Sequence, residues 1–203
     1  MKKRVAILIS GRGSNMMALV EAAAAPDFPA EIALVLSNRP DASGLEWASA
    51  RGIRAATVDH KTYGKDREAF ERAMQAVLEE NTIDLVCLAG FMRVLTSWFV
   101  SQWQGRMLNI HPALLPSYRG LHTHERALAD GVKVHGCTVH FVVPEMDAGP
   151  IIEQACVRVE DSDDADALAA RVLKEEHRIY AHALALVAGG KVRVEGNRVL
   201  MRA

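Results

Sequence analysis

Short apolar runs rich in β-branched residues alternate with amphipathic stretches through the first half of the sequence, and this alternation sets the fold class. Runs that fit strands lie at about residues 4–9, 31–36, 54–58, 84–89 and 106–110. Between them, one helix is predicted from Ser14, a good N-cap, to Pro26, and another over about 66–80. Parallel strands covered by helices give this pattern. The sequence therefore predicts an α/β, Rossmann-like fold with a mostly parallel, twisted sheet and helices on both faces.

The pattern changes near residue 134. Two consecutive strand-like runs, at 134–143 and 151–159, are joined by the turn-forming segment "PEMDAGP". A long helix is predicted over about 165–187, with the acidic cluster at 161–166 at its start, where negative charge suits the helix dipole. The hairpin "KVRVEGNRVLM" follows. The C-terminal part is therefore predicted to contain antiparallel strands and a long helix.

Composition limits the size, partners and compartment of the protein. With 203 residues, 50% of them apolar, the chain is expected to fold as one domain over 1–203. The net charge is −1 and both signs are mixed along the chain, so no basic stripe is present to attract nucleic acid or an anionic membrane. Cys87, Cys137 and Cys156 are widely spaced and odd in number, which favours neither a disulfide framework nor a zinc site. We therefore expect a cytoplasmic protein with no nucleic-acid or membrane partner.

A glycine-rich loop, "SGRGSN" at residues 10–15, directly follows the first predicted strand. A dinucleotide fingerprint would need glycine where Met16 stands, and an acid after the second strand, which instead ends in Ser37-Asn38. A P-loop would need Gly-Lys-Ser/Thr after four spacer residues, and none follows. The remaining interpretation is a helix N-terminus whose free backbone N–H groups suit one phosphate monoester. A tight turn without a ligand is the alternative.

A second polar cluster lies beyond the fifth predicted strand, in "LNIHPALLPSYRGLHTHERAL" at residues 108–128. Asn109 and His111 are two residues apart at the carboxyl end of a strand, so both can face the crevice where reactive groups of open α/β sheets lie. Asp147, in "EMDAGPII", offers a third polar group. The alternatives are a hydrogen-bonded, partly buried histidine and an ordinary turn aspartate.

Three other features have simpler interpretations. The spacing of His122 and His124 could suit a metal, but no carboxylate or thiolate is near in sequence, so no metal site is predicted. Thr123 is predicted to cap a helix that runs through Leu128. Histidines in the strand-like run after residue 134 are interpreted as packing or hydrogen-bonding residues; they are His135 and His140.

Five segments resemble, in order, the family of 10-formyltetrahydrofolate-dependent formyltransferases. They are "SGRGSN", "LAGFMRVL", "LNIHPALLPSYRGLHTHERAL", "HGCTVHFV" and "MDAGPII". The resemblance spans essentially the whole chain and is strongest to members that act on glycinamide ribonucleotide (GAR). It implies transfer of a formyl group from 10-formyltetrahydrofolate to the amino group of GAR in de novo purine biosynthesis, giving formyl-GAR and tetrahydrofolate. The implied partners are these small molecules, with no metal, and the chain is expected to be a monomer or homodimer.

The resemblance also implies a role for particular residues. It makes Asn109, His111 and Asp147 the catalytic trio. The residues implied for GAR are Arg12, Gly13, Ser14, Asn15 and Glu176, and those implied for folate are Met92, Arg93, Val94, Leu95, Asn109, Val143, Glu145 and Met146. Residues of about 1–105 would then form the phosphate-binding and nucleotide-binding half, and about 106–203 the catalytic and folate-binding half. One position departs from the family: Leu173 stands where members often have Lys or Gln for the phosphate, with Lys174 adjacent.

The implied reaction explains why these residue types are needed. Formyl transfer between two nitrogens passes through a tetrahedral intermediate whose oxygen carries negative charge. Asn109 can donate a hydrogen bond to that oxygen, and protonated His111 a charge-assisted one. Asp147 would orient His111, favour its cationic form, and order a water that carries the amine proton toward N10 of the folate. No cysteine or serine is placed to carry the formyl group, so direct transfer is expected.

Three other functions would each account for part of the sequence. A formyltetrahydrofolate hydrolase would use the same trio with water, but its relatives usually carry an additional N-terminal regulatory domain, and here the first strand begins at once. A methionyl-tRNA formyltransferase would add a C-terminal tRNA-binding domain and a basic face. A non-enzymatic nucleotide-binding module would explain the glycine-rich loop but not Asn109, His111 and Asp147.

Overall fold

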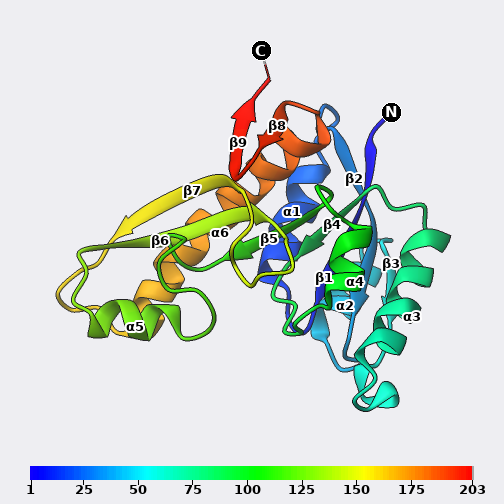
Figure 1. The fold of residues 1–203 in the computed structure, drawn as a ribbon, viewed down its shortest axis with the longest axis horizontal. Helices are drawn as coiled ribbons and strands as arrows, with labels where there is room; N and C mark the ends of the chain where they lie inside the picture. Colours follow the sequence, from blue (N-terminus) through cyan, green and yellow to red (C-terminus); the bar gives the residue numbers. More distant parts are fainter. Residues whose placement is uncertain (203) are drawn as a thin grey trace.

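The computed structural model describes residues 1–202, which form one nine-stranded sheet in the order β3-β2-β1-β4-β5-β6-β7-β9-β8 (Figure 1). The strands are β1 (Lys3–Ile9), β2 (Ala30–Ser37), β3 (Arg54–Thr57), β4 (Leu85–Leu88), β5 (Met107–His111), β6 (Val134–Phe141), β7 (Ile151–Arg158), β8 (Val192–Glu195) and β9 (Arg198–Met201). Strands β1 to β5 pair in parallel, whereas β6 is antiparallel to both β5 and β7. This topology confirms the predicted α/β fold with an antiparallel C-terminal part.

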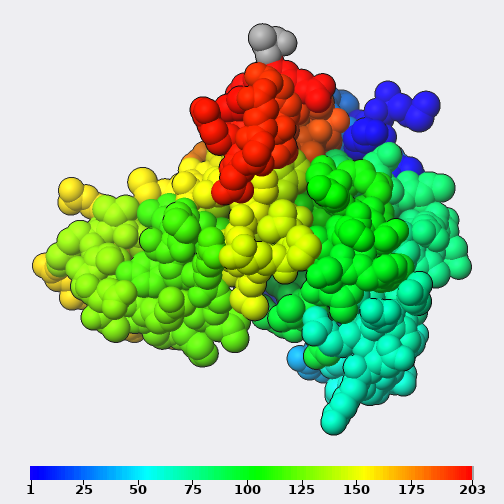
Figure 2. All heavy atoms as spheres, viewed as in Figure 1, coloured from blue at the N-terminus to red at the C-terminus, as the bar shows by residue number. Residues whose placement is uncertain are grey.

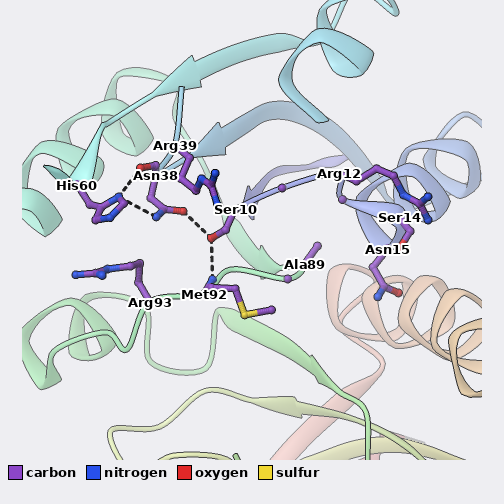
Figure 3. A pocket seen from close by; sticks show the side chains of 13 residues that line it. Ser10, Arg12, Ser14, Asn15, Asn38, Arg39, His60, Ala89, Met92 and Arg93 are labelled. Atoms are coloured by element: carbon purple, nitrogen blue, oxygen red, sulfur yellow. Dashed lines mark hydrogen bonds between the residues drawn. The ribbon is translucent and has the colours of Figure 1, made fainter. Parts of the chain in front are cut away.

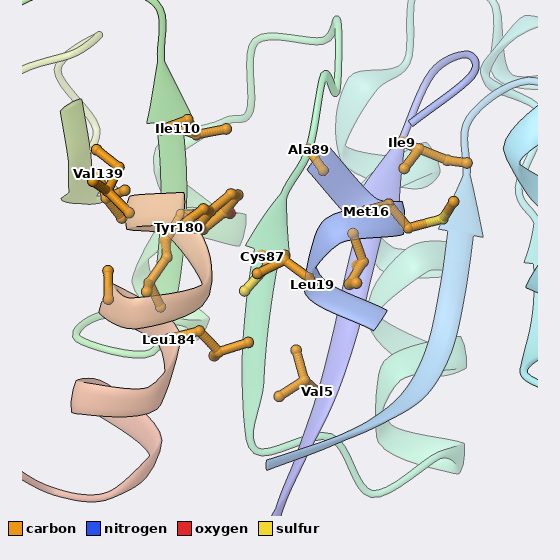
Figure 4. Close-up of a cluster of buried hydrophobic side chains, with 14 of the residues drawn as sticks. Val5, Ile9, Met16, Leu19, Cys87, Ala89, Ile110, Val139, Tyr180 and Leu184 are labelled. Carbon is orange, nitrogen blue, oxygen red and sulfur yellow. The ribbon is translucent and has the colours of Figure 1, made fainter. Parts of the chain in front are cut away.

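Helices cover both faces of the sheet. They are α1 (Ser14–Ala23), α2 (Ser43–Ser49), α3 (Arg67–Glu80), α4 (Ser97–Gln102), α5 (Thr123–Ala129) and α6 (Ala165–Ala188), with a 3-10 helix, η1 (His60–Tyr63). Alternate residues of β1 enter different cores. Val5 and Ile9 pack in the cluster that includes residues of α1 and α6 (Figure 4), and Leu8 packs with residues of α3 and α4. Because both faces are covered, β1 is an unbroken apolar run rather than an alternating one.

Tyr180 joins the long helix α6 to the middle of the sheet. Its ring is fully buried, and its hydroxyl lies 3.0 Å from the carbonyl oxygen of Leu88 and 3.2 Å from that of Leu108. These carbonyls belong to β4 and β5, the neighbouring strands whose ends carry the predicted folate and catalytic segments. A buried hydroxyl with such partners avoids the penalty of an unpaired polar group and fixes α6 against both strands.

Two predicted helix caps are wrong. Ser14 is the first residue of α1 and its side chain makes no capping bond; the N-cap is Gly13, in the left-handed region at φ 70°, which glycine adopts without a steric penalty. Thr123 is likewise the first residue of α5, and its hydroxyl donates to the carbonyl oxygen of Pro112 over 2.7 Å instead of capping. In both cases the chain turns sharply at a left-handed residue before the helix, and this tertiary turn displaces the expected cap.

The start of α6 is as predicted. Asp164 is the N-cap, and its side chain accepts a hydrogen bond from the backbone N–H of Ala167 over 2.8 Å. The short helices α2 and α4 and the 3-10 helix were not predicted, because elements of one to two turns carry too little periodicity to be recognised. Across residues 1–202, every helix is too short or too polar to cross a membrane.

Candidate active site

The glycine-rich loop at residues 10–15 is held in shape by close backbone packing. The N–H of Gly44, at the start of α2, donates to the carbonyl oxygen of Gly11 over 3.2 Å. A Cβ at Gly44 would lie 2.5 Å from Cδ1 of Ile9 and 2.9 Å from the carbonyl oxygen of Arg12, so only glycine fits there. The loop is therefore fixed from the side of α2 before any ligand binds.

The N-terminus of α1 presents free donors at this loop. Among residues 1–202, the backbone N–H groups of Ser14, Asn15 and Met16 have no acceptor, and the helix behind them is ten residues long. Ser14 and Asn15 line a cavity of about 450 Å³ (Figure 3). Its walls are the whole loop together with Asn38, Arg39, His60, Ala89, Gly90, Met92 and Arg93. Free N–H groups at the positive end of a helix dipole suit an anion.

Asn15 and Glu176, 161 positions apart in the sequence, meet beside this anion site. The Asn15 side-chain amide donates to Oε2 of Glu176 over 2.7 Å, and both side chains are buried. Burial raises the pKa of Glu176, and the Asn15 bond lowers it in part. Oδ1 of Asn15 is buried with no partner within the described chain. An unpartnered buried oxygen is unfavourable, so this atom is suited to accept a hydrogen bond from a ligand.

Asn109 is oriented by a histidine on the neighbouring strand. The antiparallel register of β5 and β6 places Asn109 opposite His140, and Nδ2 of Asn109 lies 3.2 Å from Nε2 of His140. Nδ1 of His140 lies 2.9 Å from the carbonyl oxygen of Phe141, which only accepts, so Nδ1 carries the proton and Nε2 accepts from Asn109. Burial lowers the pKa of His140, which keeps the ring neutral for this role. The second N–H of the Asn109 amide is left for a ligand.

The buried His111 pairs with Asp147, which is partly buried. Nδ1 of His111 lies 3.5 Å from Oδ2 of Asp147, and Nε2 lies 2.9 Å from the carbonyl oxygen of Tyr118. Oδ2 of Asp147 also accepts from the backbone N–H of Gly120 over 2.8 Å. Both ring nitrogens of His111 thus face acceptors, an arrangement that a doubly protonated imidazole satisfies. The structure therefore joins Asp147, at φ 50° in the β6–β7 connection, to the end of β5.

Residues 89–96, here called the loop after β4, lack regular secondary structure and carry the predicted folate residues Met92, Arg93, Val94 and Leu95. Met92 and Val94 are 69% and 62% exposed. Of the other predicted folate residues, Met146 is exposed and Glu145 pairs with Arg119 over 3.0 Å. On the face shown in Figure 2, the yellow surface of the β6–β7 connection borders the green surface over α4, with a hollow below them. The cavity at the glycine-rich loop includes Met92 and Arg93 in its wall but none of the predicted catalytic trio.

Comparison with known proteins identifies the family. Residues 3–184 match the model of the formyl transferase family. The chain belongs to this family. It is 43% identical over 193 residues to the phosphoribosylglycinamide formyltransferase of Escherichia coli (strain K12), covering 95% of this chain and 91% of that protein. It is 50% identical to the human trifunctional purine biosynthetic protein adenosine-3 over 97% of this chain, and it spans 19% of that relative's length.

Solved structures of proteins named for formyl-group chemistry are similar to this formyl transferase in fold and in sequence. The structure of glycinamide ribonucleotide transformylase 1 from Symbiobacterium toebii superposes with a TM-score of 0.95 at 44% identity, covering 98% of this chain and 94% of that one. A formyltetrahydrofolate deformylase from Pseudomonas syringae superposes with a TM-score of 0.90 at 28% identity, covering 99% of this chain and 66% of that one. The fold is therefore shared with proteins named for formyl transfer and for deformylation.

Several residues at the site of this formyl transferase were not predicted from sequence. His140 was interpreted only as a packing or hydrogen-bonding residue, and its place opposite Asn109 needs the strand register. The loop after β4 is held by the side chains of Ser10, Arg67 and Glu71: Ser10 accepts from the N–H of Met92, Arg67 donates to the carbonyl oxygen of Val94, and Glu71 accepts from Thr96. A buried glutamate in an apolar helix face, such as Glu71, is the one sequence signal that could have indicated such a role.

The remaining sequence predictions concern a metal site and the cysteines. In the part of the chain that the structure describes, no group of three or more His, Cys, Asp or Glu side chains could hold a metal ion. The cysteines are free, with Cys87 and Cys137 buried and Cys156 exposed.

Proposed function

We propose that this formyl transferase moves the formyl group of 10-formyltetrahydrofolate, bound as a co-substrate, to the amino group of GAR, giving formyl-GAR and tetrahydrofolate in de novo purine biosynthesis. The observation that carries the proposal is the pairing of the buried His111 with Asp147 next to the oriented amide of Asn109. Strand β4, next to β5, ends in the loop after β4, and strand β1, next to β4, ends in the anion site. Both therefore lie at the same edge of the sheet. The 43% identity to the Escherichia coli formyltransferase supports the same substrates.

The two ends of GAR would be held by different parts of the site. Its phosphate would accept hydrogen bonds from the backbone N–H groups of Ser14 and Asn15, with Gly13 making the turn and Arg12 at the rim. Glu176, whose carboxylate Asn15 already orients, would accept from a ribose hydroxyl. Residues of about 1–105 would thus supply most of the phosphate site. Residues of about 106–203 would supply the catalytic trio and part of the folate pocket, to which we assign Val143, Glu145 and Met146 together with Met92 to Leu95.

The chemical steps follow from this placement. The GAR amine attacks the formyl carbon, a C–N bond forms, and the carbonyl oxygen becomes an oxyanion. The free N–H of Asn109 donates to this oxyanion, and His111 donates from Nε2 once the oxyanion replaces the Tyr118 carbonyl oxygen that Nε2 now contacts. Asp147 orders a water that carries the amine proton to N10 as the C–N10 bond breaks. No covalent enzyme intermediate is needed.

The test is to incubate the protein with 10-formyltetrahydrofolate, with and without GAR, and to measure tetrahydrofolate and formyl-GAR. We expect both products in equal amounts, and only in the presence of GAR. Tetrahydrofolate and formate without GAR would instead indicate the hydrolysis suggested by the Pseudomonas syringae deformylase, which shares the fold. No turnover under either condition would contradict both reactions.

Asn15→Leu should weaken GAR binding and leave the folate dissociation constant nearly unchanged. The substitution removes the donor to Glu176 and the unpartnered Oδ1, both on the GAR side of the site. Loss of a charge-assisted hydrogen bond should reduce the GAR binding free energy by about 1.5–3 kcal/mol. Calorimetric titration with GAR and with tetrahydrofolate measures both effects, and Ser14→Ala, which keeps the backbone donors, is the matched control. Equal weakening of both ligands would mean that the loop is only structural.

Arg93→Lys should leave the folate dissociation constant within a few fold of the wild type. The Arg93 side chain makes no hydrogen bond or ion pair within residues 1–202, and the amide-like edge of a pterin can be matched by main-chain N–H and C=O groups of the loop after β4. Fluorescence or calorimetric titration with tetrahydrofolate measures the constant. A loss of about a hundredfold, roughly 2.7 kcal/mol, would show that the guanidinium itself anchors the ligand.

A further inference from the structure

Ser10 and Asn38 belong to a chain of hydrogen bonds that ends on the loop after β4 (Figure 3). The backbone N–H of Met92 donates to Oγ of Ser10 over 2.7 Å, and Oγ of Ser10 lies 2.6 Å from Oδ1 of Asn38. Nδ2 of Asn38 lies 3.1 Å from Nδ1 of His60, which is also 2.8 Å from the carbonyl oxygen of Asn38. Ser10 and Asn38 are buried, at 7% and 2% exposure. The chain therefore connects the ends of β1 and β2 and the turn after β3 to this loop.

The first two bonds have defined directions. A backbone N–H only donates, so the Ser10 oxygen accepts from Met92, and because Oδ1 of Asn38 only accepts, the Ser10 hydroxyl donates to it. Oδ1 is thereby the acceptor end of the amide, and Nδ2 faces His60. Because Ser10 and Asn38 are buried, an unmade bond between them or to Met92 leaves a buried polar atom unpaired. The loop position that satisfies Ser10 is thus strongly favoured over others.

The first half of the loop after β4 depends on Ser10. The backbone N–H of Ser10 donates to the carbonyl oxygen of Gly90 over 3.2 Å, and its hydroxyl accepts from Met92. Arg67 and Glu71 hold only the second half, at Val94 and Thr96. The exposed side chain of Met92 contributes little burial of its own.

We infer that Ser10 and Asn38, which line the cavity at the glycine-rich loop, are positioning residues for the folate co-substrate: their bonded side chains hold the Met92 main chain where it receives the pterin. This inference rests on the proposed function. It separates the two ends of the glycine-rich loop, since Ser10 acts on folate through the loop after β4 whereas Ser14 and Asn15 act on GAR. Removing the Ser10 hydroxyl should therefore change one Michaelis constant and spare the other.

The experiment is steady-state kinetics of Ser10→Ala with both substrates varied. We expect the KM for 10-formyltetrahydrofolate to rise about tenfold, the effect of losing one to two net hydrogen bonds, with kcat and the KM for GAR within twofold of the wild type. Hydrogen exchange at the Met92 amide should become faster. Thr62→Ala is the matched control, because the Thr62 hydroxyl donates only to the Asp59 carbonyl oxygen, which is not part of this chain of hydrogen bonds. It should leave all constants unchanged.

Two results would overturn the inference: an unchanged folate KM in Ser10→Ala, or an equal rise of both KM values. If Ser10→Ala does not fold, His60→Ala at the other end of this chain of hydrogen bonds tests the same inference. The expected rise in the KM for 10-formyltetrahydrofolate is then about threefold. Failure of the proposed function is recognised separately, because the wild type would then show no GAR-dependent turnover. Exchange at Met92 still tests the positioning of the loop in that case.

Discussion

His111→Ala should lower kcat for GAR formylation by about 10²–10³-fold, with the dissociation constants of GAR and tetrahydrofolate within a few fold of the wild type. The reason is that the oxyanion of the tetrahedral intermediate loses its cationic donor, whereas the ground-state ligands do not use it. Rapid-quench or steady-state assays at saturating substrates give kcat, and separate titrations give the affinities.

His122→Asn is the matched control for His111→Ala. His122 is an exposed histidine of the same segment in the left-handed region, which asparagine tolerates. The control should keep wild-type kcat. A His111→Ala enzyme that retains more than a tenth of wild-type kcat would contradict the proposed oxyanion role.

Asp147→Asn should lower kcat almost as strongly, and the double variant His111→Ala/Asp147→Asn should be scarcely slower than the slower single variant. Asparagine keeps an oxygen for the N–H of Gly120 but removes the charge that lies 3.5 Å from the imidazole. Groups that act as one unit give non-additive losses. The measurement is kcat for all four proteins at saturating substrates, with binding determined separately.

The opposite outcome of this double-mutant comparison also has a clear interpretation. If the two losses multiply fully in the double variant, His111 and Asp147 act independently. Asp147 would then handle the amine proton through water and would not orient the imidazole. The 3.5 Å contact would in that case be a consequence of the turn geometry alone.

The layout of the sheet could be predicted because it depends on local patterns. The apolar run from Val5 to Ile9 identifies a strand buried on both faces, and the two-residue spacing of Asn109 and His111 places both at one strand end. The resemblance to the family supplied Glu176 and gave a catalytic role to Asp147, a turn residue that no local pattern joins to the rest. The family assignment is confirmed by the match over residues 3–184.

What could not be predicted depends on contacts between distant segments. Whether His140 packs or orients an amide is decided by which residue of β5 it faces, and only the register of two strands gives that. The Ser10–Asn38–His60 chain requires three strand ends to meet. The failure of the Ser14 cap has the same origin, because packing of Gly44 against the loop sets the turn that precedes α1.

The pairing of Asn109 with His140 has a consequence for how the protein acquires activity during folding. Successive residues of a strand point to opposite faces, so a slip of one residue between β5 and β6 would bring Val139 or Phe141 opposite Asn109 and leave the amide without its partner. Helices can form within microseconds, whereas this pairing must close a long intervening segment first. A refolding chain would therefore regain its helical circular dichroism before its turnover. The first appearance of formyl transfer would mark the moment at which these two strands find their register.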